Sequence, residues 1–404
     1  MIIALDARPM IQPQFQGPEQ RARNILASWI KAAGDHQFHL FYALPRSNGA
    51  GASRSFDDTL LTKLPANFHP VEIPSYQLPS DFPTASRLLN PLVRALHRLK
   101  PDVYHAFTPV VPRITGCPVV PTFHDVSFDL DPVVRRTPAS RALHRVALRS
   151  IRYARRLIAV SSQTKYDIAS VYGTPPERID VIYNGIDPAF TPLPPATLPT
   201  AKPVHLANAI VGPYLLAVGA DIPRRNYARL LAAMQFVWKT PDGGRTKWVL
   251  AGRAQWELSL IHKAARQTGV LDRMRFVAAP NNAELADLYR GAMLTICASS
   301  FEGFGLSVLE SMACGTAVAC SDMRSLREVA ADAAVYFSHD DAQSMGQAIA
   351  GLLEDAEYRR QLKYRGMRRA ALFTWDTAAQ LTLESLEIAC RKPATPPLAP
   401  PAAA

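Results

Sequence analysis

Short apolar, β-branched runs alternate with segments of helical length along almost the whole chain, and this alternation constrains the fold more than any other feature. It is typical of βαβ units that build a mainly parallel sheet covered by helices. A proline-dense segment from Pro188 to Pro203 interrupts it once, and proline stiffens a linker and cannot donate to a strand ladder. The sequence therefore predicts two α/β domains in series.

The length supports this division, because 404 residues exceed what a single hydrophobic core usually serves. We expect an N-terminal Rossmann-like domain over 1–190, a proline-rich linker over 191–208 and a second Rossmann-like domain over 209–374. A helix over 375–391 is long enough to cross back to the first domain, and a Pro/Ala tail over 392–404 is expected to be disordered. Predicted strands cover 2–6, 39–43, 71–73, 103–107, 119–124, 157–161 and 179–183, then 214–219, 248–251, 274–277, 294–297, 317–320 and 334–337.

The net charge of +11 is concentrated in two helical stretches that lack acidic residues. Basic amphipathic helices suit an anionic membrane surface, although a solvated helix face explains the same pattern. No nucleic-acid-reading module is recognisable, so we expect no nucleic-acid partner. The first stretch has Arg87, Arg94, Arg98 and Lys100; the second has Arg135, Arg136, Arg141, Arg145, Arg149, Arg152, Arg155 and Arg156.

The start of the sequence, its apolar runs and its cysteines predict where in the cell the protein is located. The chain starts with a predicted strand in place of a secretion signal, and no uncharged apolar run is long enough to cross a bilayer. The five cysteines form no CxxC pair, and we interpret them as reduced. We therefore expect a cytoplasmic protein, peripheral on the inner face of the cell membrane.

In the second half of the chain, one predicted strand is followed directly by a glycine turn and the start of a helix. The predicted strand 294–297 is followed by Glu302, Gly303 and Gly305, and the helix after the turn carries Glu310. Helix N-termini at the carboxyl ends of parallel strands bind anions, and a carboxylate there can bind vicinal hydroxyls. The two glutamates could equally be an exposed loop acid and a surface helix acid.

The E-x7-E spacing of Glu302 and Glu310, within Phe-Glu-Gly-Phe-Gly-Leu, resembles the signature of family 4 retaining glycosyltransferases of the GT-B fold. Further motifs occur in the order expected for that family. They are Phe123-His124-Asp125, Val160-Ser161-Ser162 with Lys165, Val181 to Asp187, Val218-Gly219, Pro223-Arg224-Arg225-Asn226, Ala251-Gly252-Arg253, Leu288 to Ala292, and Glu328-Val-Ala. The resemblance implies two Rossmann-like domains facing a cleft, with the donor nucleotide held mainly by the second.

The resemblance also assigns roles to residues. It implies that Glu310 holds the donor ribose, that Glu302 touches the donor sugar, and that His124 lies beside the reacting sugar as a hydrogen-bond donor. Arg224 and Arg225 would face the diphosphate, where fixed cations stabilise the charge of the leaving group. The catalytic residues would thus be His124, Arg224, Arg225 and Glu302, and the donor-binding residues Gly219, Arg224, Arg225, Arg253, Glu302, Gly303, Phe304, Gly305, Leu306 and Glu310.

Two positions depart from the family pattern. Arg225 stands where lysine is usual, which keeps the charge but changes the contact geometry. After the first strand the chain has Gly17 and then Glu19 where a small residue is expected, and a carboxylate there would repel a diphosphate. We therefore expect Gly17 to belong to a loop that faces the acceptor.

No cofactor is expected beyond the nucleotide-sugar substrate. Asp129-Leu-Asp131 has the DxD spacing of metal-dependent sugar transferases, but no acidic cluster supports it and we interpret it as structural. No histidine and cysteine constellation suggests zinc. We therefore expect no metal.

The sequence thus predicts a retaining hexosyltransferase, with mannose from GDP-mannose suggested by the resemblance alone. The acceptor would be a glycan or a polyprenyl-diphosphate-linked oligosaccharide of a surface polysaccharide. A nicotinamide-dependent oxidoreductase would also have twin α/β domains, but the chain lacks G-x-G-x-x-G after its first strand. A catalytically silent sugar-binding protein is the other alternative, because of Glu19 and Arg225.

Overall fold

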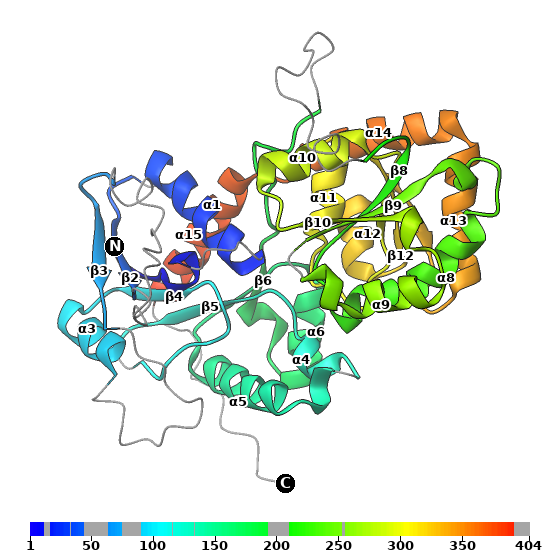
Figure 1. The fold of residues 1–404 in the computed structure, drawn as a ribbon. Coiled ribbons are helices and arrows are strands. Elements are labelled where there is room, and N and C mark those ends of the chain that lie inside the picture. The colour runs from blue at the N-terminus through cyan, green and yellow to red at the C-terminus, as the bar shows by residue number, and fades with distance from the viewer. Residues whose placement is uncertain are drawn as a thin grey trace, which may run out of the picture.

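The chain folds into two α/β halves, each built on its own parallel sheet (Figure 1). The structure, a computed structural model, describes residues 1–11, 17–32, 34–43, 64–74, 90–114, 116–132, 134–192, 210–252 and 255–391. The predicted linker lies largely, and the predicted tail wholly, outside these residues, as does Arg253.

Within the described residues, the first sheet has seven strands in the order β3-β2-β1-β4-β5-β6-β7. Strand β3 begins three residues before the predicted start, and it contains Pro70 opposite Leu40 of β2. Proline is tolerated there because β3 is an edge strand. The bounds are β1 Ile2–Asp6, β2 Gln37–Tyr42, β3 Phe68–Glu72, β4 Val103–Ala106, β5 Val119–Phe123, β6 Leu157–Ala159 and β7 Ile179–Val181.

The second sheet, over the part of the chain that the structure describes, has six strands in the order β10-β9-β8-β11-β12-β13. Its strands β8, β11 and β12 are almost entirely buried, as expected for a parallel sheet with helices on both faces. The bounds are β8 Tyr214–Val218, β9 Lys247–Gly252, β10 Met274–Ala278, β11 Leu294–Cys297, β12 Ala317–Ser321 and β13 Ala334–Phe337. Two Rossmann-like sheets confirm the predicted fold class.

The helices cover both faces of each sheet, and α15 leaves the second half to pack on the first. Figure 1 shows α15 lying beside α1, and Trp29 of α1 donates its indole N–H to the carbonyl of Ala379 at 3.0 Å. The predicted crossover helix is therefore present. The bounds are α1 Gly17–Ala32, α3 Pro91–Leu99, α4 Ser127–Leu130, α5 Pro138–Tyr153, α6 Ser162–Tyr172, α8 Tyr227–Val237, α9 Leu260–Gln267, α10 Asn282–Gly291, α11 Leu306–Ala313, α12 Arg324–Ala330, α13 Ala342–Glu354, α14 Ala356–Ala370 and α15 Trp375–Cys390.

Two chain crossings connect the halves and lie against each other. The segment after β7 passes Gly185, and the segment before α15 passes Thr374 and Trp375. A Cβ atom on Gly185 would collide with the backbone of those two residues, and Ile186 donates its N–H to Phe373 at 3.0 Å. Glycine is needed here because the two backbones touch.

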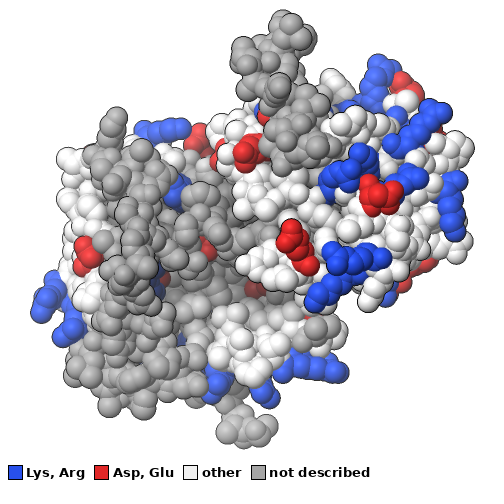
Figure 2. Space-filling view, viewed as in Figure 1, with Lys and Arg blue, Asp and Glu red and all other residues white. Residues whose placement is uncertain are grey.

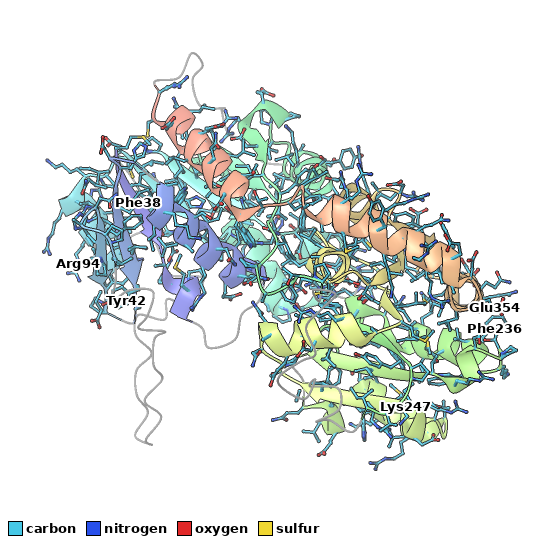
Figure 3. The ribbon with its side chains drawn as sticks, turned by 90° about the horizontal axis from the view of Figure 1, so that it is seen from above. Phe38, Tyr42, Arg94, Phe236, Lys247 and Glu354 are labelled. Carbon is cyan, nitrogen blue, oxygen red and sulfur yellow. The ribbon has the colours of Figure 1, made fainter. Side chains whose placement is uncertain are left out.

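In the two basic helices, α3 and α5, only side chains that are not packed against the core could meet a membrane surface. The apolar face of α3 packs into the core of the first half, because Leu92, Val93 and Leu96 are buried. Lys and Arg side chains lie outward over α3 and over α5 (Figure 2), and Arg94 lies at the outer edge of the first half (Figure 3). The apolar face of α3 is therefore covered by the core of the first half, and its exposed side offers charge.

Among the described residues, no helix has both the length and the apolar character needed to cross a membrane. The five cysteines form no disulfide. Burial raises the pKa of Cys314 to about 12, so that thiol behaves as a small apolar side chain.

Candidate active site

The glycine turn after β11 lies where the two halves meet. A Cβ atom on Gly303 would collide with the carbonyl oxygen of His124 in the first half. Gly305 has φ 102°, a left-handed conformation that favours glycine, and it precedes the first residue of α11. Thr164 of α6 also donates its hydroxyl to the carbonyl of Gly303 at 3.3 Å. The turn is thus pressed against the first half by backbone contacts that only glycine permits.

Glu302, on this turn, is bound by Arg225. The Nη1 of Arg225 donates to Oε1 of Glu302, and the hydroxyl of Ser299 donates to the same oxygen at 2.9 Å. Burial alone would lower the pKa of Arg225, but the carboxylate of Glu302 raises it above its ordinary value. The guanidinium also fills the space beside Gly219, where a Cβ atom would lie 2.6 Å from Nε. Gly219 therefore makes room for the arginine that replaces the usual lysine.

Arg224, the second member of the basic pair, points across to the first half. Its Nη1 donates to Oδ2 of Asp125 at 3.2 Å, and its carbonyl accepts from the backbone N–H of Ser300 at 2.8 Å. Asp125 also accepts from the N–H of Ser127 at 3.0 Å, so it caps the next turn as well. The two guanidinium groups border the same junction, but each is bound to a different carboxylate.

Glu310 is nearly inaccessible to water, on the face of α11 that looks away from solvent. Its exposed fraction is 7%, and Oε2 accepts from the hydroxyl of Tyr289 at 2.9 Å. Burial raises the pKa of Glu310 to about 7, against hydrogen bonds from Tyr289 and Gln20 that lower it. Glu302 is similarly buried, at 8% exposed. The alternative of an exposed loop acid and a surface helix acid is therefore wrong.

His124 follows β5 and is partly buried at the same junction. Its Nε2 lies 2.9 Å from the carbonyl oxygen of Phe107, which can only accept. Burial, and then the charge of Arg21, lower the pKa of His124 to about 4. The ring is therefore neutral, and its single N–H is already bound to the backbone.

Gly17 begins α1, and the first turn of this helix lies against the second half. A Cβ atom on Gly17 would be 3.7 Å from the Leu306 side chain, and Gln20 hydrogen-bonds to Glu310. The region predicted to face an acceptor thus also borders the residue expected to hold the donor ribose. Glu19 is partly exposed on the same turn.

Sequence reasoning assigned no role to three residues of this junction: Arg21, Tyr289 and Glu328. Glu328 of α12 accepts the backbone N–H groups of Ser162 and Gln163, at 2.7 and 2.8 Å, so it caps α6 across the junction. For Arg21 a signal was present, since helical spacing places it on one face with the apolar residues Ile25 and Trp29. Tyr289 and Glu328 lie within motifs of the family resemblance, but no local pattern shows their partners.

The DxD spacing belongs to a different, structural network. Asp129 binds His144 at 2.8 Å and the hydroxyl of Tyr172, and Asp131 accepts from the N–H of Val134 at 3.1 Å. Within the described ranges, no group of three or more His, Cys, Asp or Glu side chains could hold a metal ion. These contacts support the structural interpretation of both aspartates.

Two facing Rossmann-like halves, with an acidic glycine turn and a basic pair at their junction, define a GT-B glycosyltransferase. Solved structures share this architecture. Sucrose-phosphate synthase from Thermosynechococcus elongatus superposes with a TM-score of 0.74 at 18% identity, covering 96% of this chain and 98% of that one. The Anabaena protein HepE in complex with UDP-glucose gives a TM-score of 0.71 at 18% identity, over 96% and 99%.

The chain belongs to the family 4 glycosyltransferases. The model described as "Glycosyltransferase Family 4" matches residues 16–190, and the model described as "Glycosyl transferases group 1" matches residues 209–369. O-antigen chain mannosyltransferase B of Escherichia coli is 28% identical over 309 residues, which are 75% of this chain and 79% of that protein. Four relatives named D-inositol 3-phosphate glycosyltransferase are matched over only 55–64% of their lengths. The protein is therefore an enzyme of the glycosyltransferase class.

Proposed function

We propose that the protein is a retaining hexosyltransferase that uses a nucleotide-sugar donor, with mannose from GDP-mannose as the first candidate. The observation that carries this proposal is the Arg225–Glu302 pair on the glycine turn where the two halves meet. The similarity to an O-antigen chain mannosyltransferase supports mannose, whereas the complex of HepE with UDP-glucose makes that donor the first one to compare.

The second half would hold the donor. Glu310 would bind the ribose hydroxyls, and the N–H groups of the turn from Gly303 to Leu306 would face the phosphates or the transferred sugar. Arg225 and Arg224 would stabilise the departing nucleoside diphosphate, because fixed cations act best where charge develops. For this, both guanidinium groups would share or leave their present carboxylate partners, Glu302 and Asp125.

The acceptor would enter from the first half, and the reaction would replace the diphosphate on the anomeric carbon by an acceptor hydroxyl, whose proton is released. His124 and Glu302 would orient the sugar. Contacts between the halves would exclude water that otherwise hydrolyses the donor. We propose a glycan or a polyprenyl-diphosphate-linked oligosaccharide of a surface polysaccharide as the acceptor.

A panel of radiolabelled nucleotide sugars tests the reaction class. We expect slow hydrolysis of one donor without acceptor and faster turnover with a lipid-linked or free glycan. Arg225→Met should lower this turnover by about 100-fold, a typical loss when one stabilising donor of a charged transition state is removed. Arg360→Met is the control, because Arg360 is 78% exposed on α14. Binding of nicotinamide nucleotides alone would instead support an oxidoreductase, and sugar binding without turnover a silent binding protein.

We further propose that the protein is cytoplasmic and binds the inner face of the cell membrane through α5. Arg141, Arg145, Arg149 and Arg152 are exposed along one side of this helix. Arg156, after the end of α5, is paired with Asp180 at 2.5 Å. Replacing Arg145, Arg149 and Arg152 by glutamate should release the protein from anionic liposomes in a sedimentation assay. Unchanged sedimentation would reject the proposal.

A further inference from the structure

The first sheet reverses its strand order between β1 and β4, and a group of hydrogen-bonded polar side chains lies at this point. From β1 the order runs through β2 and β3 to one edge, and from β4 it runs through β5, β6 and β7 to the other. In open parallel sheets, ligands bind beyond the carboxyl ends of the strands at such a reversal. A substrate held by the first half is therefore expected beside the ends of β1 and β4.

The carboxyl edge of the first sheet is also the edge that meets the second half. The carbonyl oxygen of His124, which follows β5, lies against Gly303, and a Cβ atom on Gly17, which begins the helix after β1, would be 3.7 Å from the Leu306 side chain. Adjacent strands are about 4.8 Å apart, so the ends of β1 and β5, with β4 between them, are separated by about 10 Å. A side chain at the end of β1 thus borders the same junction as His124.

Asp6, the last residue of β1, is a buried carboxylate whose two oxygens are both fully used. Its exposed fraction is 2%. Oδ1 accepts from Nε of Arg8 at 2.7 Å and from the backbone N–H of Arg8 at 3.2 Å. Oδ2 accepts from Nη2 of Arg8 at 2.5 Å and from the hydroxyl of Tyr104, on β4, at 3.1 Å. Asp6 therefore joins β1 to β4 across the reversal and holds the guanidinium of Arg8 by two parallel hydrogen bonds.

Arg8 is the member of this group that reaches solvent. Its side chain is 37% exposed, and its Nη1 has no hydrogen-bond partner among the described residues. The forked contact with Asp6 fixes the plane of the guanidinium, so the direction of Nη1 is set before any ligand binds. Because the carboxylate cancels the charge of Arg8, the pair as a whole is neutral and attracts an anion only weakly. Such a donor suits the hydroxyl of a neutral sugar.

We infer that Arg8 is a binding residue for the acceptor: its Nη1 donates a hydrogen bond to a hydroxyl of the acceptor sugar at the β1–β4 reversal. This inference rests on the proposed function, which assigns the acceptor to the first half. Asp6 and Tyr104 act through Arg8 and are positioning residues, because Asp6 has no acceptor site left and Tyr104 is fully buried. Arg8 thus affects acceptor binding and leaves the donor site in the second half untouched.

Kinetics with soluble acceptors test this role. The probes are the methyl glycosides of mannose, glucose, galactose and N-acetylglucosamine, used with the donor that the protein hydrolyses fastest. In Arg8→Met the acceptor KM should rise roughly 10- to 100-fold, as expected for the loss of one hydrogen bond from a charged donor, whereas donor hydrolysis without acceptor should be unchanged. Arg8→Lys keeps a cation without the forked contact and should restore only part of the affinity. An unchanged acceptor KM, or an equal loss of hydrolysis and transfer, would overturn the inference.

Arg156→Met is the matched control. Arg156 forms the same forked pair with Asp180, with its Nε 2.7 Å from Oδ2 and its Nη2 2.5 Å from Oδ1. It directly precedes β6, however, so it lies at the amino edge of the first sheet, away from the junction. Both variants lose the same kind of ion pair, and only Arg8→Met should change the acceptor KM. Equal changes in the two variants would show a general effect of destabilisation and would overturn the inference.

NMR measures binding without turnover, and its result stands whether or not the protein transfers a sugar to any probe. In the full chain with ¹⁵N-labelled arginine, and with Arg8→Lys to assign the signal, the Nε–H of Arg8 should shift when a methyl glycoside is added without donor. The Nε–H of Arg156 should not shift. No change with any of the probes would overturn the inference, and a shift caused only by pyrophosphate would overturn it in favour of an anion site.

The same titration separates this inference from the proposed function. If Arg8→Met does not fold, the titration of the wild-type protein still decides whether the sugar binds beside Arg8. Absence of hydrolysis with every donor would refute the proposed function and leave the NMR result standing.

Discussion

Glu310 shows how a single carboxylate at the junction couples stability to pH. Its pKa is raised by burial to about 7 in the folded protein, whereas an unfolded glutamate titrates near its ordinary value of 4.5. Between these values the folded state binds more protons than the unfolded state, so this group makes the free energy of unfolding fall as pH rises through that window. Ionised Glu310 thus lowers the free energy of unfolding, and its proposed role in binding the donor ribose would account for a carboxylate at this buried position.

We predict that Glu310→Gln removes this cost. The neutral amide still offers an oxygen to the hydroxyl of Tyr289, so the hydrogen bond is retained. Relative to wild type, the variant should gain stability on going from pH 5 to pH 8, by on the order of 2 kcal/mol. Melting temperatures at both pH values measure this gain. An equal difference between the proteins at pH 5 and pH 8 would show that Glu310 does not titrate in this range.

How much of this site can be predicted from the sequence depends on how far apart along the chain the contacting residues lie. Glu302, Glu310 and the glycines are recognisable because a strand, a turn and a helix start are local patterns, and the structure places them together. The pairing of Arg224 with Asp125, and the burial of Arg21, depend on the packing of segments 99 and 161 residues apart. Periodicity indicates which face of a helix is buried, but it does not show what that face meets.

At the scale of elements, the contact between α12 and α6 joins the two halves, with Glu328 bound to the start of α6 and Arg324 over the ring of Tyr166 at 5.6 Å. Both carboxylate oxygens of Glu328 accept backbone N–H groups at the start of α6. A negative charge at a helix N-terminus is favourable, because the unpaired N–H groups and the helix dipole are positive there. The contact stabilises the arrangement in which the glycine turn touches His124.

We predict that Glu328→Gln weakens the contact between the halves. The amide has one oxygen for two N–H groups and no charge, so the contact between the halves should lose about 1 kcal/mol of stabilising free energy. This loss equals a roughly five-fold shift of the equilibrium toward molecules whose halves are separated. The donor KM should rise by a similar factor, and the radius of gyration from solution scattering should increase. Glu354→Gln is the matched control, since Glu354 is exposed at the far end of the second half (Figure 3). A KM and radius identical to wild type would exclude this role for Glu328.

The element bounds also show where sequence patterns are least informative. Strand β3 extends through Pro70. In a central strand this proline would break a ladder of hydrogen bonds, but β3 is an edge strand, so the missing N–H has no consequence. The amphipathic pattern of α3 suits a membrane face, yet the same pattern serves any helix that packs on a sheet. The sequence alone does not distinguish a lipid surface from the apolar face of the chain's own first sheet.

At the scale of the whole molecule, the two halves are held by two chain crossings that touch at Gly185. One crossing leaves the first sheet, and the other returns into α15, whose residues Leu386 and Ala378 complete the core of the first half. The first half therefore depends on a helix that follows the second half in the chain. A substitution that disturbs the crossings should therefore destabilise both halves.

We predict that Gly185→Ala destabilises the whole protein, because its methyl group has no space against the backbone of Thr374 and Trp375. Overpacking of this kind typically costs about 1–3 kcal/mol, and here a rigid backbone must move. The melting temperature should fall by several degrees, and proteolysis should cut earlier near residue 374. Gly351→Ala is the matched control, since a methyl group there would have nothing within 4 Å and helical alanine is favoured. Equal melting temperatures for Gly185→Ala and wild type would mean that the crossings can separate without cost, and the two halves would then be expected to unfold independently.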